Sequence, residues 1–220
     1  MRVCFAVTLL SICLRAQPAD YPHAFPRQGA KIVLDNPQGT VWEVVWPQNV
    51  PTAMHRHRFD YMGVELEDAQ VRVTTVDGQS HVATPKRDSA WFLPRNTTHI
   101  EEGLTTNPTR HAVIIDIKDN APPAGDACGS PAALDGAKSI ADNARAAIWE
   151  YTWPSAATAA SCQRGAFIVF TSGGEISVAS ATGKPKTIAV SRTQVLFRPA
   201  GRESEYATKG NVQGFIFELK

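Results

Sequence analysis

Apolar and β-branched residues occur along the chain in short runs that end at turn residues. Residues 41–46 and 71–76 are two such runs, and 112–117 is an apolar run of strand length that contains one acidic residue. Short runs of this kind favour strands, because helices need longer amphipathic segments. Asp77 and Gly78 follow the second run and predict a tight hairpin turn, since glycine tolerates a positive φ. We therefore expect an all-β protein of many short strands, arranged as a sandwich or a closed barrel.

The chain also contains an internal repeat. Residues 29–47 (GAKIVLDNPQGTVWEVVWP) match residues 136–154 (GAKSIADNARAAIWEYTWP), and shorter matches follow in the same order as far as 113–118 and 215–220. A duplicated unit predicts two lobes with one topology. The expected organisation is a signal peptide at 1–16, an N-terminal arm at 17–28, lobe 1 at 29–118, a Pro- and Gly-rich linker at 119–135, and lobe 2 at 136–220.

Residues 1–16 have the composition of an export signal, with Arg2, an apolar stretch from Val3 to Leu14, and a small residue at Ala16. The stretch is too short to span a bilayer, so we expect a secreted or periplasmic protein with no membrane partner. Cleavage would leave Cys128 and Cys162. In an oxidising compartment these two form a disulfide or remain separate, partly buried thiols.

Charge and motif content narrow the class of partner. The 22 basic and 21 acidic residues nearly cancel, which gives no electrostatic reason to expect a nucleic-acid partner. The sequence has no Gly-rich phosphate loop and no nucleophile elbow. A small-molecule substrate or ligand is the expected partner, and a homodimer is left open.

A candidate metal site is centred on His55 and His57. Alternation along a strand puts both imidazoles on one face, and neutral imidazole is a good ligand for transition metals. Asp60 shares a parity with Met62, Val64 and Leu66, and we take that apolar face as the inward one, which places the Asp60 carboxylate near the imidazoles. A third histidine completes the set, at the end of the segment WFLPRNTTH and after a proline turn. The predicted metal ligands are His55, His57, Asp60 and His99.

These features resemble the two motifs of the cupin superfamily. The resemblance rests on His55 and His57, the strand at 60–68 and the segment FLPRNTTH at 92–99. It implies tandem double-stranded β-helix, or jelly-roll, barrels (a bicupin) with a metal in the barrel mouth. Family members carry Glu a few residues after the paired histidines, a place that falls near Tyr61 here. A site of three histidines without a carboxylate therefore stays open.

Lobe 2 is predicted to lack the site. Carried along the repeat, the positions of His55, His57, Asp60 and His99 fall on Cys162, Arg164, Gly165 and Ser204. The predicted cofactor is one divalent transition metal, from Fe, Mn, Zn, Ni and Cu, in lobe 1 only.

Three functions fit this sequence. The first is a metal-dependent enzyme acting on a small molecule, and the cupin resemblance implies dioxygenase, decarboxylase or isomerase chemistry. Tyr61, Glu65 and Arg95 are candidates to surround that site. The alternatives are a non-catalytic module that binds a metal or small ligand, and an exported protein whose metal only stabilises the barrel.

Overall fold

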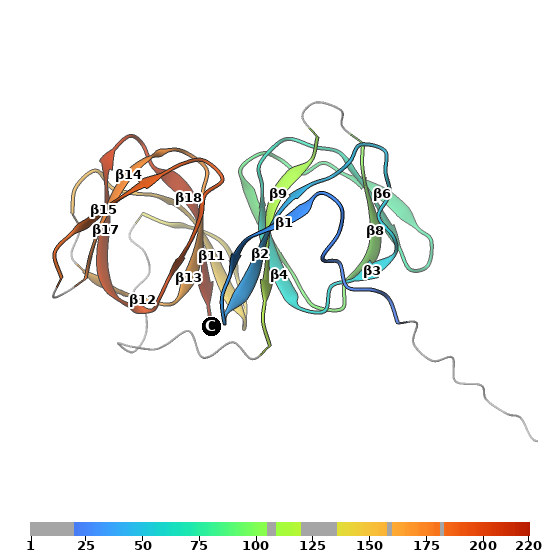
Figure 1. The fold of residues 1–220 in the computed structure, drawn as a ribbon, viewed down its shortest axis with the longest axis horizontal. Coiled ribbons are helices and arrows are strands. Elements are labelled where there is room, and N and C mark those ends of the chain that lie inside the picture. Colours follow the sequence, from blue (N-terminus) through green and yellow to red (C-terminus); the bar gives the residue numbers. More distant parts are fainter. Residues whose placement is uncertain (1–19, 105–108, 120–135, 158–159, 181–182) are drawn as a thin grey trace, which may run out of the picture.

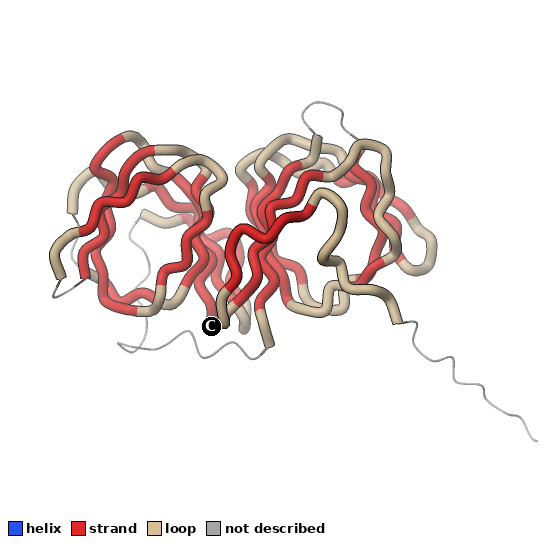
Figure 2. The backbone as a smooth tube through the Cα atoms, viewed as in Figure 1, coloured by secondary structure: helices blue, strands red, loops and turns tan. Residues whose placement is uncertain are grey.

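The structure is a computed structural model that describes residues 20–104, 109–119, 136–157, 160–180 and 183–220. The predicted signal peptide and Cys128 lie outside these residues, so whether Cys128 and Cys162 form a disulfide, which the sequence left open, is not described. All secondary-structure elements in the described part of the chain are β-strands (Figure 2). Among these residues, no helix is long and apolar enough to cross a membrane.

The strands of the described residues fall into two sets of nine. The first set is β1 (Ala30–Asp35), β2 (Gly39–Val45), β3 (His55–Arg56), β4 (Asp60–Glu65), β5 (Val71–Thr75), β6 (Ser80–Ala83), β7 (Ser89–Leu93), β8 (Thr98–Gly103) and β9 (His111–Ile117). The second set is β10 (Lys138–Asp142), β11 (Ala146–Thr152), β12 (Ser161–Gln163), β13 (Ala166–Phe170), β14 (Gly174–Ser180), β15 (Lys186–Val190), β16 (Val195–Arg198), β17 (Gly201–Lys209) and β18 (Gln213–Leu219).

Each set forms one barrel of two antiparallel sheets, and the two barrels lie side by side (Figure 1). In lobe 1 the sheets have the orders β1-β2-β9-β4-β7 and β3-β8-β5-β6. In lobe 2 they have the orders β10-β11-β18-β13-β16 and β12-β17-β14-β15. The second pair of orders repeats the first strand for strand, which confirms the prediction that the lobes share one topology.

Equivalent tryptophans show how closely the duplication is kept. Trp42 on β2 donates its indole N–H to Asp116 on β9 at 3.0 Å. Trp149 on β11 donates to Glu218 on β18 at 2.9 Å. The repeated tryptophans are therefore structural residues of each barrel wall, in which a buried N–H needs an acceptor.

The two five-stranded sheets pack against each other and form a hydrophobic core between the lobes. Met62 and Val64 from β4 contact this core from one side, and Phe167 and Val169 from β13 do so from the other. Tyr61, by contrast, belongs to the cluster inside lobe 1. Strand β4 is therefore buried on both faces, with one face towards lobe 2 and the other towards the barrel interior.

The predicted hairpin turn is present between β5 and β6. Gly78 has φ of 81°, in the left-handed region that favours glycine. The Asp77 carboxylate accepts a hydrogen bond from the Gln79 backbone N–H at 3.3 Å. This turn fixes the register of two strands that line the cavity described below.

Candidate metal centre

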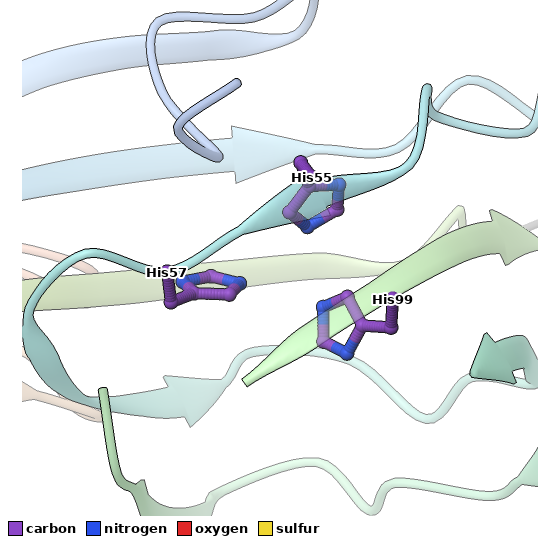
Figure 3. A group of neighbouring side chains, drawn as sticks. All are labelled: His55, His57 and His99. Carbon is purple, nitrogen blue, oxygen red and sulfur yellow. The ribbon is translucent and has the colours of Figure 1, made fainter. Parts of the chain in front are cut away.

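Three buried histidines converge inside lobe 1 (Figure 3). His55 lies on β3 and pairs directly with His99 on β8, while His57 follows β3. The His57 N–H donates to the Thr97 carbonyl at 2.9 Å, and its carbonyl accepts from Asn96 at 2.7 Å, which holds this residue against the start of β8. One ring nitrogen from each histidine lies within 4.8 Å of the others. The predicted convergence of the three imidazoles is therefore what the structure shows.

The nitrogens at this point have no partner within the described part of the chain. His55 Nε2, His99 Nε2 and both ring nitrogens of His57 are buried and make no hydrogen bond. His55 Nδ1 donates to the Ala53 carbonyl at 2.9 Å, which leaves its Nε2 lone pair directed into the cluster. A backbone carbonyl on the outer nitrogen is the usual way to orient a metal-ligating histidine.

Burial keeps these imidazoles neutral. It lowers the pKa of His55 to about 4 and that of His57 to about 2, and it lowers the pKa of His99 as well. Desolvation is the largest cause in each case, because a buried imidazolium loses its hydration. The neutral form is the one that ligates metals, so the donor set fits a transition-metal ion.

A buried ionic network lies beside the histidines. Arg110 donates to Glu65 through Nε and Nη2, at 3.2 and 2.7 Å, and to Glu101 through Nη1 at 2.7 Å. Glu101 also accepts from Arg27, at 3.1 and 3.2 Å, and from the indole of Trp46 at 3.3 Å. The two arginines hold the pKa of Glu101 well below its ordinary value, against the opposing effect of its burial.

Tyr61 packs directly on one of the histidines. Its ring is parallel to that of His57, with centroids 3.7 Å apart and planes 3° apart. The motif that the sequence resembles carries Glu near this position, and this chain has the phenol of Tyr61 there. Burial raises the pKa of Tyr61 above its ordinary value, which keeps the hydroxyl protonated.

A cavity of about 540 Å³ opens beside the cluster. His57, Tyr61 and His99 line one part of it, and strands β5, β6 and β7 provide most of the remaining wall. This volume is within the usual range for small-molecule sites. The histidine cluster therefore borders a space that a substrate could enter.

The structure corrects the interpretation of Asp60. Its carboxylate lies on the face of β4 that is turned towards lobe 2, where it meets the Arg145 guanidinium at 3.1 Å and accepts from the Arg95 backbone N–H at 3.0 Å. It is not part of the histidine cluster. The inward face of β4 carries Tyr61 and Glu65 instead, because the apolar face packs on the other lobe and not on the barrel interior.

Of the other three candidate residues, two line the cavity and one lies away from it. Tyr61 and Glu65 line the cavity as expected of groups around the site. Arg95 does not, since it forms ion pairs with Asp119 and Asp60. Sequence reasoning missed Glu101, although alternation along β8 places it on the same face as His99. It also missed Arg110, for which the sequence holds no comparable signal.

The predicted correspondences in lobe 2 are displaced. His55 pairs with His99 in lobe 1, and the matching pair in lobe 2 is Ser161 with Glu203. By the same register Gln163 stands at the place of His57. The positions read from the repeat, Cys162, Arg164 and Ser204, are therefore one residue off. The histidine cluster of lobe 1 has no counterpart among the described residues of lobe 2.

The described part of the N-terminal arm, from residue 20 onward, packs on lobe 1. Phe25 is buried and stacks on Trp42, with ring centroids 4.8 Å apart, and it meets the His57 ring edge to face, with centroids 6.2 Å apart. Arg27 from the same segment supplies the ion pair to Glu101. The arm therefore completes the barrel wall around the histidines.

Solved structures with a similar fold include two enzymes and a protein described as a cupin. A salicylate 1,2-dioxygenase variant from Pseudoaminobacter salicylatoxidans gives a TM-score of 0.57 at 11% identity, covering 83% of this chain and 71% of that one. An oxalate decarboxylase variant from Bacillus subtilis gives 0.52 at 12% identity, with 93% and 78% covered. A cupin 2 conserved barrel domain protein from Leptotrichia buccalis gives 0.52 at 11% identity, with 87% and 88% covered.

The resemblance lies in the fold and not in overall sequence. No protein-family model matches the chain, and no curated protein matches it in sequence. The strand orders and these structural similarities both indicate two β-barrels in tandem. The chain therefore has the cupin fold, repeated as two barrels in tandem.

Proposed function

We propose that the protein is a metal-dependent enzyme that acts on a small molecule in the lobe 1 cavity. The observation that carries this proposal is the set of three buried, neutral imidazoles beside that cavity, each with a ring nitrogen that makes no hydrogen bond to the described residues. His55, His57 and His99 would hold one divalent transition metal. Three protein ligands leave coordination positions open, and a metal in such a site can bind oxygen or polarise a substrate carbonyl or carboxylate.

The residues around the cluster define what the chain itself contributes. The Ala53 carbonyl orients His55, and the Tyr61 ring fixes the plane of His57. The three histidines are buried, so the surrounding protein keeps water away from them except where the cavity opens. The fold similarity to a salicylate 1,2-dioxygenase and an oxalate decarboxylase supports a role in dioxygenase or decarboxylase chemistry.

One observation favours the alternative of a non-catalytic binding module. Both carboxylates that line the cavity are held by arginine, so neither is free to act as a general base. Chemistry at this site would have to depend on the metal and on neutral groups such as Tyr61.

The test is a turnover screen on protein purified without a His-tag and loaded separately with Fe, Mn, Zn, Ni or Cu. Oxygen uptake and product mass are recorded with small phenols, ketones and carboxylic acids. We expect turnover with at least one metal and its loss in His99→Ala, while His111→Ala keeps it. Ligands that bind but are recovered unchanged from every metal form would establish the binding module instead.

We also propose that the protein is exported, on the basis of residues 1–16. Intact mass of protein from the expressing cell's exported fraction is expected to begin near Gln17. Retention of Met1 in the mature protein would contradict export.

A further inference from the structure

The cavity beside the histidine cluster carries no free charge among the described residues. Its permanently charged lining groups are Glu65, Glu101 and Arg110. Both oxygens of Glu65 accept from Arg110, one oxygen of Glu101 accepts from Arg110, and the other accepts from Arg27. Two carboxylates thus balance two guanidinium groups. Without a metal ion in the histidine cluster, a charged ligand would find no counter-ion among these side chains unless it broke this network, and an unpaired buried charge is costly.

The remaining wall is mostly apolar. Val71, Val73, Ala83, Leu93 and Ile114 line the cavity. Such a surface favours a ligand of which most of the area is hydrocarbon.

The indole of Trp91 adds an aromatic surface to this wall. It lies against Gly63 on β4, where a Cβ atom would meet the ring at 2.7 Å, and at an edge-to-face angle to Tyr61, with centroids 5.5 Å apart. Gly63 therefore makes room for Trp91 in the wall. Two aromatic rings at this angle can contact a third ring in the cavity.

One neutral donor in this wall is unused. The Tyr61 side chain lines the cavity, its residue is only 2% exposed, and its hydroxyl makes no hydrogen bond with the described residues. Thr97 is close enough to oppose the rise in the pKa of Tyr61, but no hydrogen bond of ordinary geometry joins the two hydroxyls. Thr97 instead donates to the Pro94 carbonyl at 2.7 Å. A buried donor without an acceptor is costly, and a ligand atom would remove that cost.

We propose that this cavity binds an uncharged aromatic molecule with one hydrogen-bond acceptor, and that this acceptor takes a hydrogen bond from the Tyr61 hydroxyl. The inference rests on the proposed function, of which it names the substrate class. Tyr61 is then a specificity-determining residue. Its hydroxyl places the polar group of the ligand next to His57, on which the Tyr61 ring stacks.

The experiment compares three one-ring probes on metal-free protein, so that binding to a metal does not enter. Acetophenone is neutral and has a carbonyl acceptor, ethylbenzene lacks the acceptor, and benzoate carries a charge. Dissociation constants come from NMR titration of the labelled protein. We expect acetophenone to bind about fivefold more tightly than ethylbenzene, the value of one net hydrogen bond, and benzoate to bind at least about tenfold more weakly than acetophenone.

Two tyrosine variants make the assignment specific. Tyr61→Phe keeps the ring and is expected to bring the acetophenone constant to within about twofold of that for ethylbenzene, since only the hydroxyl is lost. Tyr151→Phe makes the same change in the buried cluster of lobe 2 and should leave all three constants unchanged.

The possible results separate this inference from the proposed function. Benzoate binding as tightly as acetophenone, no binding of either neutral ring, or no effect of Tyr61→Phe would each overturn the substrate class. Metal analysis of the same protein before chelation reports on the metal site by itself. If the protein holds metal but the three probes do not bind as expected, only the proposed substrate class is contradicted. If the probes bind as expected but the protein holds no metal, only the proposed metal-dependent enzyme is contradicted.

Discussion

The rings of His57 and Tyr61 lie parallel, with centroids 3.7 Å apart. This contact couples the candidate metal centre to strand β4, because it fixes the plane of one ligand by the position of a neighbouring wall residue. Tyr61→Ala removes that support and leaves a cavity. We expect the free energy of unfolding to fall by about 3 kcal/mol or more, as for other buried aromatic truncations.

The loss should appear in urea unfolding and in a weaker metal affinity measured on the same protein. Tyr61→Phe is the matched control, since it keeps the stacked ring, and should retain both properties. Metal affinity unchanged in Tyr61→Ala would show that the stacking does not orient His57.

The buried ionic network gives a second prediction. Arg110→Met leaves Glu65 and Glu101 without their shared guanidinium, and breaking a buried pair from one side costs about 3–5 kcal/mol. The exposed pair Lys138–Glu150 is the control, for which Lys138→Met should cost less than about 1 kcal/mol. Chemical denaturation measures both, and equal losses in the two variants would refute the central role of Arg110.

Asp60 should matter for the contact between the lobes and not for metal. Its carboxylate faces Arg145 of lobe 2 at 3.1 Å, so Asp60→Asn should lower the free energy of unfolding by about 1–3 kcal/mol. Metal content, measured by elemental analysis, should stay at the wild-type value. Loss of metal in this variant would restore Asp60 as a ligand and contradict the structure.

The metal-free protein should lose stability in mild acid. The folded pKa of His55 and of His57 lies below the ordinary value of 6.5, so between pH 6.5 and about 4 the unfolded chain binds protons that the folded chain does not. Stability therefore falls as pH falls through this window. At pH 5 the loss is about 2 kcal/mol for each of these two residues, relative to pH 7.5.

Urea unfolding of the metal-free protein at pH 7.5, 6 and 5 measures this slope. His55→Asn should reduce it, whereas His81→Asn, at an exposed position, should leave it unchanged. If stability falls equally with pH in the wild type, His55→Asn and His81→Asn, the buried imidazole of His55 does not titrate as described.

Much of the fold could be predicted because duplication leaves a direct record in the sequence. The matched tryptophans predicted two lobes of one topology, and alternation around His55 and His57 predicted a shared face. Asp60 was misplaced because β4 is buried on both faces. Its apolar side packs on lobe 2, so hydrophobic parity alone did not distinguish the barrel interior from the contact between the lobes. Arg110 could not be predicted, since its partners Glu65 and Glu101 come from separate strands.

The metal content of the protein tests the central claim most directly. Protein purified without a His-tag is analysed for metal by mass spectrometry, alongside His55→Ala, His57→Ala, His99→Ala and the control His111→Ala, whose ring contacts Glu43 away from the cluster. We predict about one transition-metal ion per wild-type chain and per control chain, and its loss in each of the three cluster variants. A wild-type protein without metal, or cluster variants that keep full occupancy, would contradict the assignment of His55, His57 and His99 as the metal centre.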